Sequence, residues 1–279
     1  MDLTLLALLL FLAAVIAGII GALVGIGGGI LIVPLLTLAF GFNIHVAIGT
    51  SIVSVIATSS GAAAAYVRDH LTNIRIGMLL ELATTIGAVC GALVAGILEP
   101  RILFVLFGVV LLLSIAPMVA KLRQQQVVVK DDGMSTFFRL GSSYPDHESG
   151  KEVAYGARRV PAAFGMMWVA GLVSGLLGIG SGTLKVLAMD TAMGLPIKVS
   201  SATSNFMIGV TAAASAGIYF WRGDVTPVVA APVALGVLLG AMLGAKLLVD
   251  FKSENIRLLF VAVLAIVSIE MLLRGAGIA

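Results

Sequence analysis

The chain has 279 residues, of which 60% are hydrophobic and only 11% are charged, and its formal net charge is +3. A soluble domain carries about 25% charged and about 45–50% apolar residues, so this composition excludes an ordinary water-soluble fold. A lipid bilayer accommodates such a chain, because a helix that faces lipid can be apolar all round.

Ten apolar runs follow one another along the chain, and we expect each to form a helix. Most reach about 20 residues, enough to cross about 30 Å of hydrocarbon. Two runs are shorter and begin in glycine clusters, so we expect half-helices or broken helices there. The predicted class is an all-α polytopic membrane protein, with apolar runs at 3–24, 29–41, 45–67, 74–97, 101–120, 161–179, 183–194, 199–221, 225–249 and 254–275.

Residues 121–160 differ from the rest, because seven Lys or Arg and five Asp or Glu fall among them. Forty such residues cannot bury a core of their own, so we expect a polar loop that transport does not require. Its positive charges predict a cytoplasmic location. The loop divides the chain into an N-terminal transmembrane repeat, 1–120, and a C-terminal transmembrane repeat, 161–279.

The two parts resemble each other in sequence. Gly25–Gly29 aligns with Gly178–Gly182, and the separation of 153 (178 minus 25) recurs in further pairs. Such internal similarity is typical of membrane transporters built from repeats. The further pairs are Thr50 and Ser51 with Thr203 and Ser204, Tyr66 with Tyr219, Gly87 with Gly240, and Gly91 with Gly244.

The direction of the second repeat depends on whether the short runs cross the membrane. If all runs cross, each repeat has five segments, the repeats are inverted, and both termini lie outside. If the two short runs return to the side that they left, the repeats are parallel and the termini lie inside. The inverted arrangement keeps slightly more positive charge inside, so we prefer it.

The two glycine clusters are candidates for a substrate site. A glycine-rich break followed by a helix leaves backbone N–H groups and a positive dipole end that suit an anion. The alternative is close helix packing, which we prefer for Gly87, Gly91, Gly236, Gly240 and Gly244. The positions predicted to bind the anion are Gly27, Gly28, Gly29, Gly180, Ser181 and Gly182.

Lys185 lies one turn inside the second short run, far from the loops. An intramembrane charge is costly and usually faces a cavity or a partner, so we expect Lys185 to attract the anion directly. The alternative is a structural ion pair with Asp190. A spacing of five residues, however, puts the two side chains on different faces of a helix. Ile32 is the equivalent position in the first repeat, which makes any basic site asymmetric.

Polar side chains open the third segment of each repeat. Thr50, Ser51, Thr203, Ser204 and Asn205 carry donors that suit a tetrahedral oxyanion, and the alternative is that they cap or pack helices. Glu81 and Asp190 are candidates for a coupling proton, or else they meet the membrane interface.

We find no catalytic constellation, and we predict neither an enzyme nor a cofactor. His45, His70 and His147 all lie at segment ends or in the loop, so none can activate Ser181. The single cysteine, Cys90, offers no disulfide and no metal cluster. Basic and aromatic residues are not interleaved as in a nucleic-acid site, so we expect no nucleic-acid partner.

The duplicated motifs resemble those of the TauE/SafE family, the sulfite and organosulfonate exporters. The likeness rests on Gly25–Pro34 and His45–Ser51, and in the second half on Gly178–Lys185 and Ala202–Gly209. The family pattern has glycine where Ser181 stands and proline where Leu187 stands, so we expect a straighter second short helix. The resemblance implies export of small sulfur oxyanions or organosulfonates.

These observations predict a secondary transporter, an exporter of a small sulfur-containing anion that binds near the bilayer midplane between the two repeats. An anion channel is the alternative, which unitary currents would reveal. We expect a multi-pass protein of the cytoplasmic membrane, whose partners are the small anionic substrate and the lipid bilayer. A homodimer is compatible with this interpretation.

Overall fold

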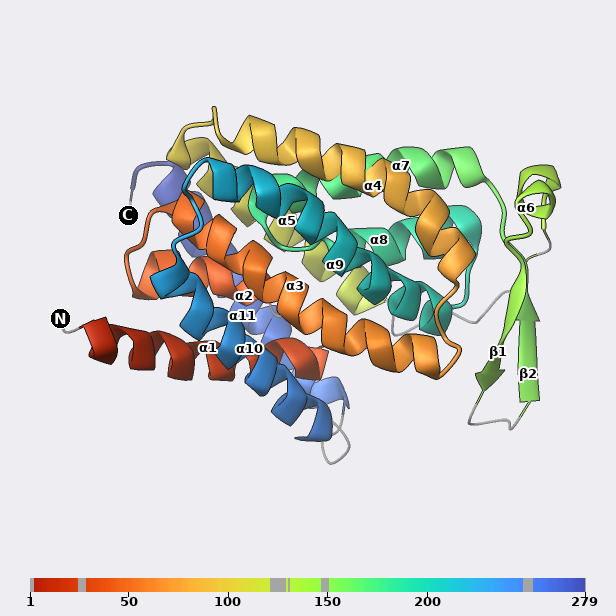
Figure 1. Cartoon of the computed structure of the whole chain (residues 1–279), viewed down its shortest axis with the longest axis horizontal. Helices are drawn as coiled ribbons and strands as arrows, with labels where there is room; N and C mark the ends of the chain where they lie inside the picture. Colours follow the sequence, from red (N-terminus) through yellow and green to blue (C-terminus); the bar gives the residue numbers. More distant parts are fainter. Residues whose placement is uncertain are drawn as a thin grey trace.

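In the computed structural model, which describes residues 3–24, 29–120, 129, 131–146, 151–247 and 253–278, the long helices form one bundle (Figure 1). The elements follow in this order: α1 (Leu3–Val24), α2 (Gly29–Pro34), η1 (Leu35–Ala39), α3 (Ile44–Arg68), α4 (Ile74–Ala95), α5 (Pro100–Ala120), α6 (Gly133–Phe137), β1 (Ser142–Asp146), β2 (Lys151–Tyr155), α7 (Val160–Leu177), α8 (Gly182–Ala188), η2 (Met189–Met193), α9 (Ile197–Trp221), α10 (Pro227–Leu247) and α11 (Ser253–Gly275). Every predicted apolar run coincides with helix to within a few residues.

The chain is mostly helical, as predicted for an all-α membrane protein, but the segment 121–160 is not a plain loop. Within 121–160 the chain forms the short helix α6 and an antiparallel pair, β1 and β2, in which Tyr144 is opposite Val153. Tyr144 and Tyr155 are buried and belong to a core that includes Ile76 of α4. The segment therefore packs its buried side chains against the helical bundle. The charge count of the segment alone does not indicate this packing.

Asn73 attaches this segment to the helices. Its side chain caps α4 by accepting from the Ile76 amide at 3.1 Å, and its Nδ2 donates to the Leu140 carbonyl at 2.9 Å and to the Tyr155 hydroxyl at 3.0 Å. The Asn73 amide donates to Thr203 Oγ1 at 3.0 Å. One residue thus joins the α3–α4 turn, the hairpin and α9.

The two short helical segments share an unusual ending. α2 passes into a π-helical turn, η1, and α8 passes into another, η2. Pro34, which has no N–H to donate, is the last residue of α2 and directly precedes the widened turn. Leu187 does not straighten the second segment as we expected, because η2 forms without a proline. Single π turns within helices are frequent at functional sites.

Glycines bring the helices of the two halves close together. Side chains at Gly87 or Gly91 of α4 would collide with the backbone of α7, at Trp168 and Leu172. Gly236 and Gly240 of α10 are packed in the same way against α1, at the carbonyls of Phe11 and Val15. The packing interpretation of these four glycines is confirmed.

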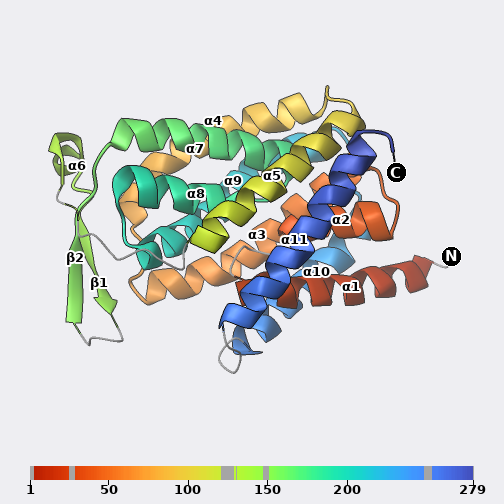
Figure 2. The same cartoon turned by 180° about the vertical axis from the view of Figure 1, so that it is seen from behind.

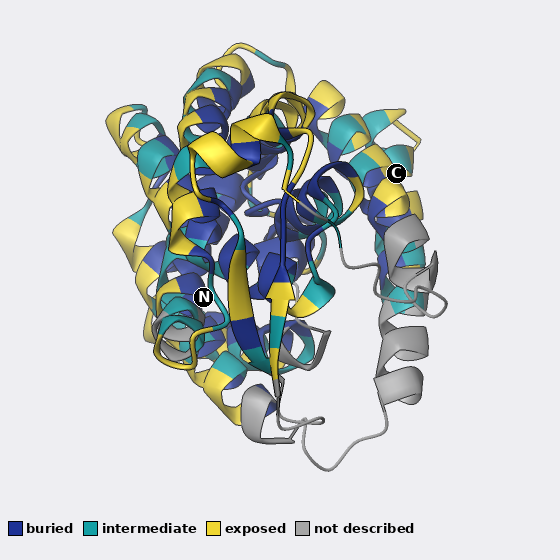
Figure 3. Cartoon of the chain, turned by 90° about the vertical axis from the view of Figure 1, so that its right-hand side faces the viewer, coloured by how far each residue is buried: buried dark blue, intermediate teal, exposed yellow. Residues whose placement is uncertain are grey.

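Many residues on the outside of the bundle are exposed (yellow in Figure 3), and a large number of them are large hydrophobic residues. On α4 the exposed side chains Met78, Leu82 and Ile86 recur every four residues and form one stripe. An exposed apolar surface of this extent suits lipid rather than water. Four described helices are long and apolar enough to cross a membrane, within Leu3–Gly21, Ile74–Ala95, Val160–Leu177 and Pro227–Gly244.

Helices α1 and α7 run in opposite directions along the bundle (Figures 1 and 2). α1 begins near the N-terminus at one end of the bundle, whereas α7 begins beside the hairpin at the other end. The N- and C-termini lie at the same end, away from β1 and β2. Four helix pairs each join the first half of the chain to the second. α1 packs on α10, α4 on α7, α3 on α9, and α5 on α11.

Candidate functional site

The second glycine cluster forms a tight break between α7 and α8. Gly178, Gly180 and Ser181 have φ values of +68°, +72° and +43°. Glycine adopts this left-handed region freely, whereas a serine pays a steric cost there. Ser181 is therefore held by its surroundings, and its Oγ donates to the Ala170 carbonyl at 2.6 Å. In the first cluster, Gly27 and Gly28 lie outside the described residues.

The two broken segments meet at Ser51 of α3. Its Oγ lies 3.0 Å from the Gly29 carbonyl oxygen and 2.8 Å from the Gly178 carbonyl oxygen, so it contacts both halves. Ser204 of α9 occupies the equivalent position and donates to the Gly182 carbonyl at 3.1 Å. Each serine thus donates to a backbone carbonyl at the start of a short helix, and Ser51 also contacts a carbonyl at the end of α7.

Most of the other predicted donors also have protein partners. Thr203 Oγ1 accepts from the Asn73 amide, and Asn205 Nδ2 donates to the Ser201 carbonyl one turn earlier. Thr50 differs, because its Oγ1 is buried and has no hydrogen-bond partner. Among these side chains, Thr50 is therefore the one with an uncommitted hydroxyl.

Lys185 is completely buried, with 0% of its surface exposed. Its Nζ donates to Thr211 Oγ1 of α9 at 2.6 Å, and the Thr211 hydroxyl lies 2.7 Å from Glu81 Oε1 of α4. The partner of the lysine is thus this threonine and, through it, Glu81, rather than Asp190. Asp190 is half-buried in η2.

Thr211 and Thr85 are the members of this cluster that sequence reasoning missed. Thr85 Oγ1 donates to Glu81 Oε1 at 3.2 Å, and the Thr211 hydroxyl, which also lies 2.8 Å from the Met207 carbonyl, is within hydrogen-bond distance of the same oxygen. One signal was available, because Thr58 and Thr211 are separated by the same 153 residues (211 minus 58) as the recognised pairs. A threonine inside an apolar helix is common, so the signal is weak without the tertiary contact.

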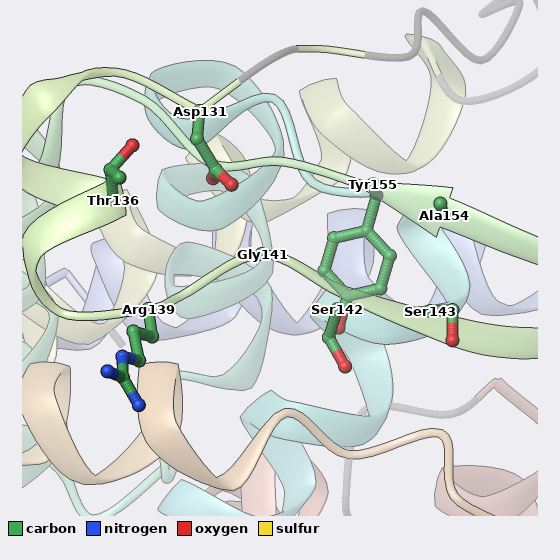
Figure 4. Close-up of a pocket in the computed structure, with 8 residues that line it drawn as sticks. All are labelled: Asp131, Thr136, Arg139, Gly141, Ser142, Ser143, Ala154 and Tyr155. Atoms are coloured by element: carbon green, nitrogen blue, oxygen red, sulfur yellow. The ribbon is translucent and has the colours of Figure 1, made fainter.

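A second polar feature lies on the polar segment, at the hairpin end of the molecule. Figure 4 shows an open groove there, lined by Asp131, Thr136, Arg139, Gly141, Ser142, Ser143, Ala154 and Tyr155. These residues are outside the membrane-spanning helices and do not include any member of the Lys185 cluster. Within the described part of the chain, no group of three or more His, Cys, Asp or Glu side chains is placed to hold a metal ion.

In the Lys185 cluster, one threonine hydroxyl lies between an ammonium group and a carboxylate. A buried ammonium group is balanced by a carboxylate through a neutral hydroxyl, so the two charges compensate without touching. An ammonium group in a dry interior attracts a second anion strongly, because the low dielectric weakens screening.

The chain was compared with known proteins. A family profile described as Sulfite exporter TauE/SafE matches residues 10–271. The chain is 26% identical over 274 residues to "Probable membrane transporter protein YunE" of Bacillus subtilis, covering 96% of this chain and 97% of that protein. It is 29% identical to "Probable membrane transporter protein YdhB" of Bacillus subtilis, over 83% and 84% of the two chains. It is 24% identical to "Probable membrane transporter protein MJ0441" of Methanocaldococcus jannaschii, over 95% of each chain. No solved structure matches the chain significantly.

Proposed function

We propose, from the premise that this chain belongs to the sulfite exporter TauE/SafE family, that it is a secondary transporter which exports a small sulfur-containing anion. Sulfite or an organosulfonate is the substrate class in this proposal, and the cell membrane is its location. The chain is a multi-pass membrane protein of a transporter family. The proposal includes no catalytic step and no cofactor.

The buried Lys185 is the observation that carries the proposal. A cation placed inside a membrane bundle is costly, and it persists where it has a functional or structural partner. Here its counter-charge, Glu81, is one hydroxyl away rather than in direct contact. A purely structural ion pair gains most from direct contact, so the indirect geometry favours a lysine that exchanges partners.

We propose that the two halves, 1–120 and 161–279, form inverted repeats flanking the segment 121–160. Three observations support this: α1 and α7 run in opposite directions, helices of each half pack on helices of the other, and Ser51 and Ser204 make equivalent bonds to Gly29 and Gly182. Inverted-repeat transporters hold substrate near the midplane, where broken helices meet. The proposed anion site is therefore the interior region beside Ser51 and Lys185.

The proposed binding residues divide into two groups. Lys185 and Thr50 are proposed to contact the anion through side-chain donors, since Thr50 Oγ1 has no partner of its own. The remaining residues are proposed to form the backbone cradle and to hold its shape, namely Gly27, Gly28, Gly29, Ser51, Gly180, Ser181, Gly182, Thr203, Ser204 and Asn205. A homodimer stays a prediction that this proposal does not require.

The test is transport by the purified protein in proteoliposomes, with labelled sulfite and with isethionate, a simple organosulfonate. A carrier is expected to saturate and to exchange internal for external anion. Unitary currents in planar bilayers would instead identify an anion channel. Absence of both flux and binding for both anions would refute the proposal.

Lys185→Met provides the residue-level test. Loss of a hydrogen bond to a charged group costs about 1.5–3 kcal/mol, so affinity should fall by about tenfold to hundredfold. Ile32→Met, at the equivalent first-half position, is the matched control and should bind as the parent does. Because Lys185→Met leaves Glu81 buried without its counter-charge, the double variant Lys185→Met with Glu81→Gln tests the same loss in a neutral interior. Full affinity in both lysine variants would make the lysine structural.

A further inference from the structure

Glu81 is the one acidic member of the buried cluster, and its two oxygens have different surroundings. Oε1 lies within hydrogen-bond distance of the Thr211 and Thr85 hydroxyls, whereas Oε2 is buried and has no hydrogen-bond partner. The residue is only 6% exposed. An ionised carboxylate normally has both oxygens satisfied, and an orphan oxygen in a dry interior is costly. A proton on Oε2 lowers that cost, because a neutral acid is cheaper to bury than an unpaired ionised oxygen.

The charge balance of the cluster links this proton to the anion. With Lys185 protonated and Glu81 ionised, the buried region is neutral. An anion that binds Nζ adds one negative charge to the same interior, where an uncompensated charge is strongly disfavoured. Protonation of Glu81 restores neutrality, so the anion and the proton each promote binding of the other.

We propose that Glu81 is the proton-binding site of this transporter, and that each singly charged anion is carried together with one proton. This inference rests on the anion transport proposed above. The proton adds to Glu81 Oε2 when the anion replaces Thr211 on Lys185 Nζ. It returns to water when the anion leaves and the lysine donates to Thr211 again. No covalent bond other than the O–H bond forms or breaks.

The surroundings leave few other groups for this role. α4 packs against α7 and α9, and within Val160–Leu177 of α7 the sequence has no titratable residue. Of the charged and titratable groups on the described elements around Glu81, Lys185 is the one that reaches its carboxylate, through Thr211. The others are Arg75 and Cys90 on α4, Asp190 in η2, and Lys198 and Tyr219 on α9.

Isethionate is the suitable probe, because a sulfonate stays fully ionised near neutral pH and contributes no proton of its own. Purified full-length protein is mixed with isethionate in weakly buffered solution containing a pH indicator, and affinity is measured in parallel between pH 6 and pH 9. The parent should take up about one proton per anion bound. Its affinity should fall by about tenfold per pH unit once Glu81 is ionised in the free protein.

Glu81→Gln mimics the protonated acid and should bind isethionate with an affinity that does not change with pH and without proton uptake. Glu99→Gln alters an exposed carboxylate before α5 and is the matched control, which should take up the proton as the parent does. If Glu81→Gln does not fold, the test rests on the number of protons that the parent takes up for each anion bound.

The outcomes separate the two proposals. If the parent binds isethionate without proton uptake, or if folded Glu81→Gln still takes up one proton per anion, Glu81 is not the proton site, while anion binding stands. If the parent binds neither isethionate nor sulfite, the proposed function fails and this inference fails with it.

Discussion

At the scale of single residues, Ser51 joins the two halves through one hydroxyl group. The group is fully buried and lies within hydrogen-bond distance of carbonyls from both broken segments, at Gly29 and Gly178. Its one hydrogen is shared between two acceptors, and water cannot replace it in a closed interior. Neighbouring Thr50 is equally buried, but its hydroxyl makes no hydrogen bond.

Ser51→Ala should therefore destabilise the protein, because it removes a buried hydroxyl that contacts backbone carbonyls of two separate segments. We expect a loss of about 1–3 kcal/mol, measured as a lower midpoint of thermal unfolding in detergent. Thr50→Val is the matched control. It removes a hydroxyl with no partner and should leave the midpoint unchanged, while weakening isethionate binding if Thr50 contacts the anion. Equal midpoints for Ser51→Ala and the parent would show that Ser51 does not hold the breaks together.

At the scale of elements, small residues determine how the helices cross. Gly171 and Gly175 of α7 face α4, where an added side chain at either position would collide with the backbone of Thr84 or Ala88. Gly18 of α1 meets Val237 of α10 in the same way, and Gly18 and Gly171 are 153 residues apart (171 minus 18). Close backbone approach of this kind is how membrane helices associate without a hydrophobic driving force.

Gly171→Leu should force α7 away from α4 and displace Glu81, which lies on the same stretch of α4. Overpacking typically costs about 1–3 kcal/mol, and more where backbone is the obstacle. Gly165→Leu is the control on the same helix, since nothing lies within 4 Å of a side chain added there. Gly171→Leu should lower the midpoint of thermal unfolding and weaken isethionate binding. Gly165→Leu should change neither. A wild-type response from Gly171→Leu would contradict the tight crossing.

The short helix α6 depends on Asp132, which lies outside the membrane-spanning segments. Its carboxylate accepts from the Ser135 amide at 2.8 Å and from the Arg159 amide at 2.7 Å. These hydrogen bonds, with that from Ser135 the largest cause, lower the pKa of Asp132 below its ordinary value. The folded-state pKa is thus depressed, so the stabilisation is present above the unfolded pKa and is lost as the pH falls through the folded one.

Pepsin, which prefers aromatic residues and works in acid, can report this loss at the exposed bond between Phe137 and Phe138. At pH 4 the variant Asp132→Ala should be cleaved faster than the parent, because its cap is missing. As the pH is lowered to 2, the two rates should converge, because protonation weakens the cap of the parent. A ratio of rates that does not change with pH would show that the ionised cap does not stabilise α6.

At the scale of the whole molecule, the two ends of the bundle differ. The termini lie together at one end, and α6 with β1 and β2 lies at the other (Figure 1). The positive charges of the segment 121–160 predict that the hairpin end is cytoplasmic. The opposite end, with both termini, is then outside the cytoplasm.

Labelling tests this orientation directly. In a Cys90→Ala background, Ser142→Cys on the exposed side of β1 should be protected from a membrane-impermeant thiol reagent in intact cells and labelled after lysis. A reporter that is active only in the cytoplasm should be silent when fused after Ala279. Labelling of Ser142→Cys in intact cells together with an active reporter would reverse the orientation.

The amino-acid sequence by itself determined the helices, the glycine break at Gly178–Gly182 and the duplicated serines. Those features are local, since hydropathy, glycine content and the 153-residue spacing are read along one stretch at a time. Lys185 was recognisable for the same reason, because a charge inside an apolar run stands out.

The tertiary structure alone decided which side chains meet. A membrane helix can be apolar on its lipid face and on its protein face, so its sequence has no polar stripe to show which face packs inside. Glu81, Thr211 and Lys185 come from three helices, and only their packing makes them one cluster. The hairpin of the segment 121–160 also depends on tertiary contacts, because Tyr144 and Tyr155 are buried against the helical bundle rather than within their own segment.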